Sequence, residues 1–253
     1  MIRRDGHTHP NIMKKPAQGD DFVRSAIAAG LDEIVFTDHM PFTVTGDERD
    51  RIPFGKVSDY VRFAREIADK YKNDIKVSVG IEIDFHPTCV DEIREVLSAG
   101  QFDTVLGSSH LNIKGFGVPF GSITRGKYAA LVIENYTKAA ESGLFDVLTH
   151  LDVYRFVFEE PENYPLTDDG YEATRLEGEL RHLFSAMEKR GVALEFNTAP
   201  LYKGFGQIGA YPCRDILKIA SDYSLRYTYG SDAHSADKVG FGLAEFERFR
   251  TGK

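Results

Sequence analysis

Six of the eight histidines in this 253-residue chain, together with two carboxylates, lie where a run of apolar residues ends. They are His7, His9, His39, His110, His150 and His234, with Glu82 and Asp232. His7 and His9 are two residues apart in a short predicted strand, so their side chains point to the same face and can bind one ion. A carboxylate between histidine groups can bridge two ions about 3.5 to 4 Å apart. The set predicts a multinuclear metal site and favours a metal hydrolase.

The types of these residues also limit the metal. Imidazole and carboxylate ligands with no cysteine among them suit zinc, manganese or iron. Any one of these histidines alone is more often a hydrogen-bonded core residue than a ligand. It is therefore the whole set that carries the prediction.

The segments around these residues resemble the PHP phosphoesterases, a family named for polymerase and histidinol phosphatase. The matching segments are His7-Thr8-His9, Thr37-Asp38-His39, Gly80-Ile81-Glu82, Ser109-His110, Thr149-His150 and Ser231-Asp232-Ala233-His234. Within the family the histidinol-phosphatase branch is the nearer match. It is matched by Arg4-Asp5-Gly6-His7, Phe36-Thr37-Asp38-His39-Met40-Pro41, Glu195-Phe196-Asn197-Thr198 and Tyr211-Pro212. The resemblance covers nearly the whole chain.

The resemblance implies an α/β fold, a distorted (β/α)7 barrel, that holds two or three divalent ions of zinc, manganese or iron. It assigns one ion to His7, His9, Glu82 and Asp232, a second to Glu82, His110 and His150, and a third to His39 and His234. The family usually supplies one more histidine to the third ion, in a turn after the first motif. This chain reads Pro10-Asn11-Ile12-Met13-Lys14-Lys15-Pro16 there. Either water completes the shell of a third ion, or His39 and His234 act on the substrate beside a two-metal core.

The reaction implied by the resemblance is the hydrolysis of L-histidinol phosphate to L-histidinol and phosphate, a step of histidine biosynthesis. Hydroxide activated by the metals would attack phosphorus in line. Two alternatives stay open. A hydrolase of the same architecture could cleave another phosphomonoester, a nucleotide phosphodiester or a C–N bond. A non-catalytic domain could keep metals for structure, but a structural site is normally closed and four-coordinate rather than polynuclear.

Three further side chains are candidates for binding the substrate. Arg155 follows His150 by five residues and Lys203 follows the sixth predicted strand, so both could neutralise charge on the phosphate. Each could equally be a solvated surface charge. Asn197 could contact the organic leaving group.

The leaving alkoxide also needs a proton. His39 or His234 could supply it if the third ion is absent. We expect Asp38 to orient a ligand histidine through a hydrogen bond.

Short apolar strands that alternate with amphipathic helices must position these residues, which is the pattern of parallel β/α units. Strands are expected to end near residues 6, 36, 82, 108, 149, 196 and 230, and helices to span 20–29, 60–71, 91–99, 127–142, 171–189 and 214–223. Ser58 is the expected N-cap of the second helix. Gly30, Gly100, Gly143 and Gly191 are expected left-handed stops. The carboxyl ends of barrel strands meet at one opening, where residues far apart in sequence come together.

Composition agrees with one soluble enzyme domain over residues 1–253. A hydrophobic content of 42% can form one large core. The net charge of -8 and the lack of a lysine or arginine run argue against a nucleic-acid surface. The small phosphorylated substrate that the resemblance implies must therefore be attracted by the local charge of the metals. Cys89 and Cys213 lie outside the ligand motifs and are expected to be thiols in a reducing cytosol. The absence of an apolar signal-like or membrane-spanning segment predicts a cytoplasmic protein with no membrane partner.

Overall fold

The computed structural model describes residues 2–40, 51–53, 55–111, 125–157, 176–204 and 209–252. Within them, parallel strands alternate with helices, as the sequence predicts. The strands are β1 (Arg4–Thr8), β2 (Glu33–Phe36), β3 (Lys76–Asp84), β4 (Thr104–Ser108), β5 (Val147–Leu148), β6 (Ala193–Asn197) and β7 (Tyr227–Gly230). They follow one another in the sheet in the order β1 to β7. Every strand ends within two residues of its expected position.

The helices connect these strands in sequence order. They are α1 (Pro16–Ala28), α2 (Val57–Tyr71), α3 (Val90–Ala99), α4 (Arg125–Ser142), α5 (Tyr154–Val157), α6 (Glu177–Arg190), α7 (Ala199–Tyr202), α8 (Arg214–Ala220) and α9 (Leu243–Thr251). None of the helices that the structure describes is both long and apolar enough to cross a membrane.

The chain groups into two compact units. The first consists of Met1–Ile83, Cys89–Leu106 and Tyr229–Lys253, and the second of Asp84–Thr88 and Gly107–Thr228. The expectation of a single domain over residues 1–253 stays a prediction.

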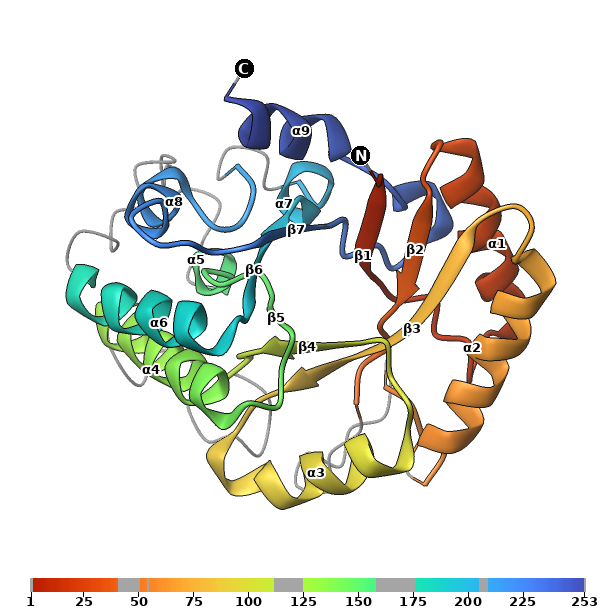
Figure 1. The fold of residues 1–253 in the computed structure, drawn as a ribbon, viewed down its shortest axis with the longest axis horizontal. Coiled ribbons are helices and arrows are strands. Elements are labelled where there is room, and N and C mark those ends of the chain that lie inside the picture. Colours follow the sequence, from red (N-terminus) through yellow and green to blue (C-terminus); the bar gives the residue numbers. More distant parts are fainter. Residues whose placement is uncertain are drawn as a thin grey trace. The chain divides into compact units, whose positions relative to one another are not determined.

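In the first unit, β1, β2 and β3 pair in parallel and lie side by side, with α1 and α2 along them (Figure 1). All four residues of β2 are buried, which is typical of a parallel strand covered on both faces. Phe22 and Val23 of α1 and Tyr60 of α2 complete this core. Gly80 in β3 is required by a close approach, since a Cβ there would lie 2.8 Å from the carbonyl oxygen of Thr104.

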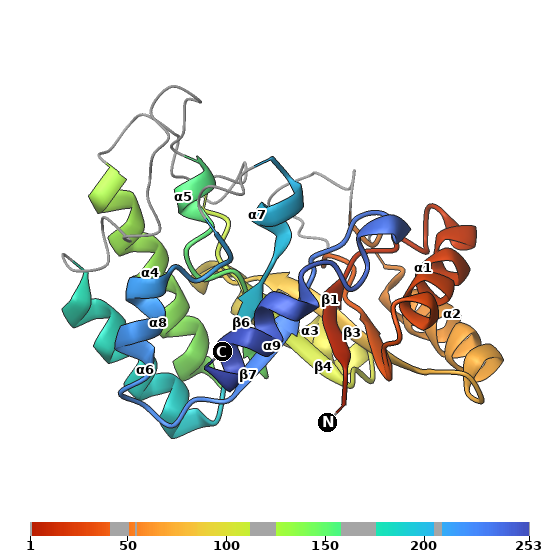
Figure 2. The ribbon, with the colours of Figure 1, turned by 90° about the horizontal axis from the view of Figure 1, so that it is seen from above.

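In the second unit, β5 and β6 pair in parallel, with Val147 opposite Ala193. Helices α4, α6 and α8 lie side by side (Figure 2). Leu180, Leu183 and Phe184 of α6 are fully buried. The long helices therefore contribute apolar faces to the packing of this unit.

Two expectations about helix ends are wrong. Ser58 does not cap α2, because the helix begins one residue before it and the Ser58 hydroxyl donates to the carbonyl of Ala99. Gly100 is extended, with a φ of -122°, rather than left-handed. A Cβ at this position would lie 2.5 Å from the Phe102 ring, which would have to move. Gly30, Gly143 and Gly191 do have left-handed φ values of 68°, 71° and 69°.

Several helix boundaries also differ from the expected ones. Helix α2 begins at Val57 rather than at residue 60, and α8 ends at Ala220 rather than at residue 223. Helix α1 starts at Pro16, four residues before the expected start, because proline is pre-organised for the first turn of a helix. The expected helix over 171–189 is described only from Glu177, because residues 171–175 lie outside the described part.

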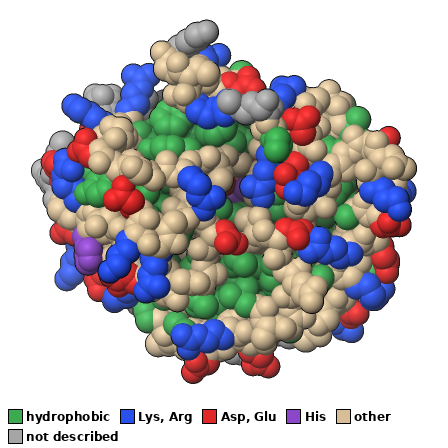
Figure 3. All heavy atoms as spheres, viewed as in Figure 1, with side chains coloured by type: hydrophobic (Ala, Val, Ile, Leu, Met, Phe, Trp, Pro, Cys, Tyr) green, Lys and Arg blue, Asp and Glu red, His purple; other side chains and the backbone are tan. Residues whose placement is uncertain are grey.

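Charged side chains of both signs are interspersed on the face shown in Figure 3. Several charged side chains of the described residues form short-range pairs along helices. Arg62, for example, contacts Asp59 at 3.2 Å and Glu66 at 3.0 Å. Such exposed pairs add little to stability individually.

A more buried ionic cluster joins the amino ends of the first strands. Glu33 on β2, which is 7% exposed, lies 3.1 Å from Nε of Arg4 and 3.3 Å from Nζ of Lys76. The Ser78 hydroxyl donates to the same Glu33 oxygen at 2.7 Å. Arg4 also donates to the hydroxyl of Thr104 at 2.8 Å. The cluster thus ties β1, β2, β3 and β4 together at one end.

Replacing Glu33 with alanine is expected to lower the free energy of unfolding by about 3 kcal/mol, because the Arg4 guanidinium loses its ion-pair partner and the Ser78 hydroxyl loses its acceptor. Chemical denaturation followed by circular dichroism measures the change. Arg24→Ala, which removes an exposed pair with Asp21, is the control and should leave the free energy nearly unchanged. Equal stability of Glu33→Ala and the unmodified protein would contradict the prediction.

Candidate metal centre

The first unit brings together six of the eight residues that the sequence assigns to metal. His7 and Glu82 lie within β1 and β3, and the other four follow β1, β2 and β7 by one to four residues. These four are His9, His39, Asp232 and His234. All six therefore lie at or just beyond the carboxyl ends of strands.

Four of these side chains point their ligand atoms at one small region. The Nε2 atoms of His7 and His9 are 2.9 Å apart, and each is 3.3 Å from Oε2 of Glu82. Oδ1 of Asp232 lies 3.5 Å from Nε2 of His9 and 4.0 Å from that of His7. Imidazole nitrogens and carboxylate oxygens that converge in this way are suited to a divalent cation.

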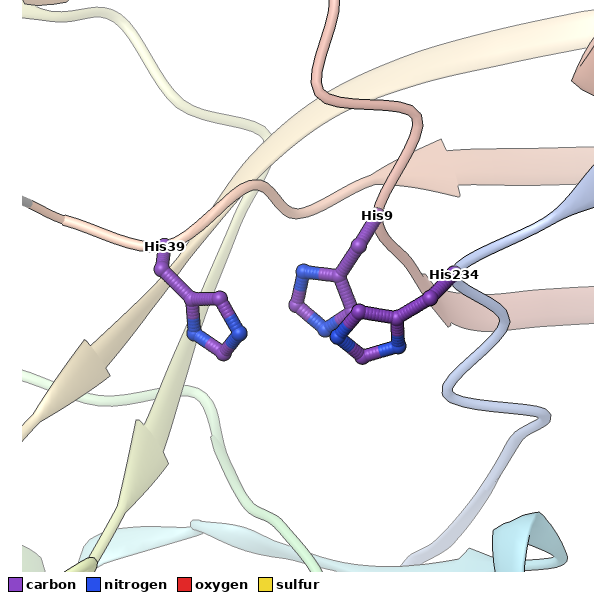
Figure 4. Close-up of side chains that lie close together, drawn as sticks. All are labelled: His9, His39 and His234. Atoms are coloured by element: carbon purple, nitrogen blue, oxygen red, sulfur yellow. The ribbon is translucent and has the colours of Figure 1, made fainter. Parts of the chain in front are cut away.

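The remaining two histidines lie against His9. Its ring stacks on that of His39, with centroids 4.2 Å apart, and is 4.4 Å from the ring of His234 (Figure 4). Nδ1 of His39 lies 2.9 Å from Oε2 of Glu82, and Nδ1 of His234 lies 3.4 Å from Oδ1 of Asp232. The ligand atoms of His9, His39 and His234 all lie within 4.8 Å of one another. Sequence reasoning gave His9 to the first ion only and missed that it also joins this second group.

Burial makes His9 a neutral ligand rather than a cation. His7 is 0% and His9 4% exposed. The pKa of His9 lies well below the ordinary 6.5, first because burial penalises the charged ring and then because His39 and His234 repel a positive charge. Nδ1 of His9 and Nδ1 of His39 are buried without a hydrogen-bond partner among the described residues. The neutral His9 ring has a lone pair to offer, and imidazole and carboxylate groups are ligands that divalent ions accept, so the donor set fits divalent ions.

The backbone at Asp232 is held in an uncommon conformation. Its φ of 54° is in the left-handed region, which few residues other than glycine adopt. The Asp232 N–H donates to the carbonyl of His7 at 2.9 Å, and the His9 N–H donates to the carbonyl of Ala233 at 2.7 Å. These two bonds fix the Asp232 segment against β1.

Asp5 supports the same segment from within β1. Its fully buried carboxylate accepts the N–H of Ser231 at 3.0 Å and the N–H of Gly240 at 2.9 Å. Burial nevertheless raises the pKa of Asp5. The sequence analysis did not assign Asp5 a role. A carboxylate inside an apolar strand beside a metal motif could have indicated that it supports the site.

Asp38, expected to orient a ligand histidine, holds backbone instead. Its two oxygens accept the N–H groups of Asn11 and Ile12 at 2.8 and 3.1 Å. Burial raises the pKa of this carboxyl to about 6. Asp38 thereby fixes the turn that follows His9, and a catalytic role for it stays a prediction.

In the second unit, the two remaining predicted ligands lie next to each other. The ring centroids of His110 and His150 are 4.8 Å apart. His150 has a φ of 24°, and its N–H donates to Oε2 of Glu195 at 2.8 Å. Asn197, a predicted substrate ligand, donates its amide to the same oxygen at 3.0 Å. Glu195 therefore supports both residues, a role that sequence reasoning missed.

The two cationic candidates have different environments. Arg155 is only 5% exposed and donates to Oδ2 of Asp152 at 3.2 Å, so the alternative of a solvated surface charge is wrong for this residue. Asp152 also accepts the N–H of Cys213 at 2.9 Å. Lys203 is exposed, just after α7, with Nζ 5.9 Å from the Tyr202 ring.

Comparison with known proteins places this arrangement in a family. The family model described as the PHP domain matches residues 5–199. A protein of Deinococcus radiodurans named "Probable histidinol-phosphatase" is 30% identical over 255 residues, covering 95% of this chain and 90% of that protein. The histidinol-phosphatase of Bacillus subtilis is 25% identical over 275 residues, covering 97% of this chain and 98% of the relative.

A solved structure extends the comparison to the fold. It is the crystal structure of histidinol phosphate phosphatase from Lactococcus lactis, complexed with zinc, L-histidinol and phosphate. The TM-score is 0.74 at 20% sequence identity, covering 99% of this chain and 94% of that one. This likeness confirms the fold class that the sequence predicts, α/β of the distorted (β/α)7 barrel type. On the family match and the 30% identity over nearly its full length, the chain belongs to the PHP domain family.

Proposed function

We propose that this protein is a metal-dependent phosphatase that hydrolyses L-histidinol phosphate to L-histidinol and phosphate, as a step of histidine biosynthesis. The observation that carries the proposal is the convergence of His7, His9, Glu82 and Asp232 on one buried region. The names of its relatives, and the zinc, L-histidinol and phosphate bound to the Lactococcus lactis enzyme, support the choice of substrate.

The proposed metal ligands fall into groups that follow the observed clusters. His7, His9, Glu82 and Asp232 hold one divalent ion, and His39 and His234 either hold another or act on the substrate. His110 and His150 hold a further ion, for which we keep Glu82 as the expected bridging ligand. Bound divalent ions would polarise the phosphate ester and lower the pKa of water towards about 7, so that hydroxide is available at neutral pH. Zinc, manganese and iron all accept this donor set.

The protein's own groups have three further tasks in this proposal. Arg155, a buried and permanently charged guanidinium, binds phosphate oxygens, and Lys203 and Asn197 contact the rest of the substrate. His39 or His234 gives a proton to the leaving alkoxide. His234 is the more accessible of the two, with 45% of its side chain exposed against 16% for His39. The substrate is a small molecule, and we place the reaction in the cytoplasm, without a nucleic-acid or membrane partner.

A panel of substrates on metal-reconstituted protein tests the proposed reaction. We expect hydrolysis of L-histidinol phosphate, with a kcat/KM well above that for other phosphomonoesters, a phosphodiester and a cyclic amide. A chelator should abolish the activity and added zinc or manganese should restore it, because the hydroxide and the charge stabilisation both depend on the metals. Phosphate release, or product formation followed by chromatography, measures each rate. Activity confined to diesters or amides would contradict the assignment.

Glu82→Gln should lower kcat/KM by about 1,000-fold, because removing an anionic ligand loses several kcal/mol of metal-dependent stabilisation. Metal per chain, measured by elemental analysis after dialysis, should fall in the same variant. His182→Ala provides the matched control, since this histidine has 69% of its side chain exposed, and it should keep full activity and metal content. Wild-type activity of Glu82→Gln would remove the basis of the proposal.

His39→Ala distinguishes an acid–base role from a role as a ligand. If His39 protonates the leaving group beside a two-metal core, turnover should fall by about 100-fold while two ions stay bound per chain. Steady-state kinetics and metal analysis of the same preparation give both values. Loss of both ions from this variant would refute the acid–base role.

A further inference from the structure

We propose that Asp84 is the positioning residue of His110: it fixes the tautomer and direction of the ring so that Nε2 is the metal-binding nitrogen. The inference rests on the proposed metal-dependent function and adds a residue that neither the ligand motifs nor sequence reasoning assigned. Asp84 is the last residue of β3, and both residues belong to the second unit.

The contact between the two side chains is short and directional. Oδ1 of Asp84 lies 2.6 Å from Nδ1 of His110. An ionised carboxylate only accepts hydrogen bonds, so Nδ1 carries the proton in this pair. In a neutral imidazole the second nitrogen, Nε2, is then the one with a free lone pair. A carboxylate bound to the far nitrogen also makes the ring a stronger ligand.

The carboxylate is itself held in place. Asp84 is 1% exposed, and the Ser108 hydroxyl donates to its Oδ1 at 3.1 Å. The N–H of Phe85 donates to the carbonyl of Ser108 at 2.9 Å, which joins the end of β3 to the end of β4. His110 follows Ser108 by only two residues. Its ring direction is therefore set both by the carboxylate and by the backbone that carries it.

Asn135 of α4 locks the same two segments from outside the sheet. Its side-chain amide donates to the carbonyl of Phe85 at 2.7 Å and to the hydroxyl of Ser109 at 3.0 Å. An amide nitrogen has two protons, so both bonds can form together. Asn135 is only 6% exposed, so contacts with the protein rather than with solvent hold its side chain in place. The network thus holds the Asp84 and His110 side chains next to each other.

A double-mutant cycle separates this role from ordinary structural support. Zinc and cobalt affinities are measured by competition with a chromophoric chelator for the unmodified chain, Asp84→Ala, His110→Ala and the double variant. Asp84→Ala is expected to lower the affinity for the most weakly bound ion by about 10- to 100-fold. In the His110→Ala background the same change should weaken it by no more than about twofold, since the ring through which Asp84 acts is gone. Asp84→Asn, whose amide oxygen can still accept from Nδ1, should recover most of the affinity.

Two controls exclude a general loss of structure. Glu33→Ala removes another buried carboxylate that contacts no histidine in the described part of the chain, and it should leave metal affinity unchanged. Nitrogen-15 NMR of the metal-free protein reports the tautomer directly. His110 should be protonated at Nδ1 in the unmodified chain and shift towards the Nε2-protonated form in Asp84→Ala.

The outcomes distinguish this inference from the proposed function. Equal losses of affinity from Asp84→Ala in both backgrounds, or an unchanged tautomer, would overturn the positioning role while leaving the phosphatase proposal intact. A cycle with the expected coupling in a protein that does not hydrolyse L-histidinol phosphate would keep the role of Asp84 and reject the substrate. A chain that binds no divalent metal would overturn both.

Discussion

Glu82 is the centre of the site in the first unit: its side chain is 1% exposed, and its Oε2 lies within 3.3 Å of nitrogens from His7, His9 and His39. A buried carboxylate is costly unless positive charge or hydrogen bonds compensate it. Burial drives the pKa of His9 down, so this neighbour does not supply the charge at neutral pH. We propose that a divalent cation supplies it. Such a cation would explain why so many ligand atoms share one buried region, and the proposed chemistry depends on it.

The rest of the first unit can be understood as support for that convergence. Strand β1 carries His7, and the bonds from Asp232 and His9 to the backbone of β1 and Ala233 fix the closing segment of the chain beside it. Asp5 contributes by accepting two N–H groups from that segment. These bonds hold Asp232 at a left-handed φ of 54°, which is uncommon outside glycine and is the kind of backbone conformation found at functional sites. The Glu33 cluster, which stabilises the fold, lies at the opposite ends of the same strands. Different residues therefore provide stability and function.

The sequence predicted the strands, and the placement of the candidate metal ligands at their ends, because both depend on local patterns of residues. A buried strand is a short apolar run, and the His7-Thr8-His9 spacing places two rings on one face without knowledge of the fold. The partners of these residues could not be predicted in this way. Asp5 bonds to Ser231, which is 226 residues away, and Glu195 bonds to His150 across 45 residues. Such pairs are defined only once the strands are in register. The Ser58 cap was wrong because a tertiary contact overrode a local preference: the hydroxyl bonds to Ala99, 41 residues away. At Gly100 the chain is extended instead, with the Phe102 ring packed close to it.

The central claim is that His7, His9, Glu82 and Asp232 together bind a divalent cation. Anomalous diffraction from crystals of the zinc-loaded protein, recorded on both sides of the zinc absorption edge, tests it most directly. We expect a zinc peak within about 2.0 to 2.2 Å of Nε2 of His7, Nε2 of His9 and an oxygen of Glu82. Zinc found only elsewhere on the molecule, with these side chains hydrogen-bonded to one another and to water, would contradict it.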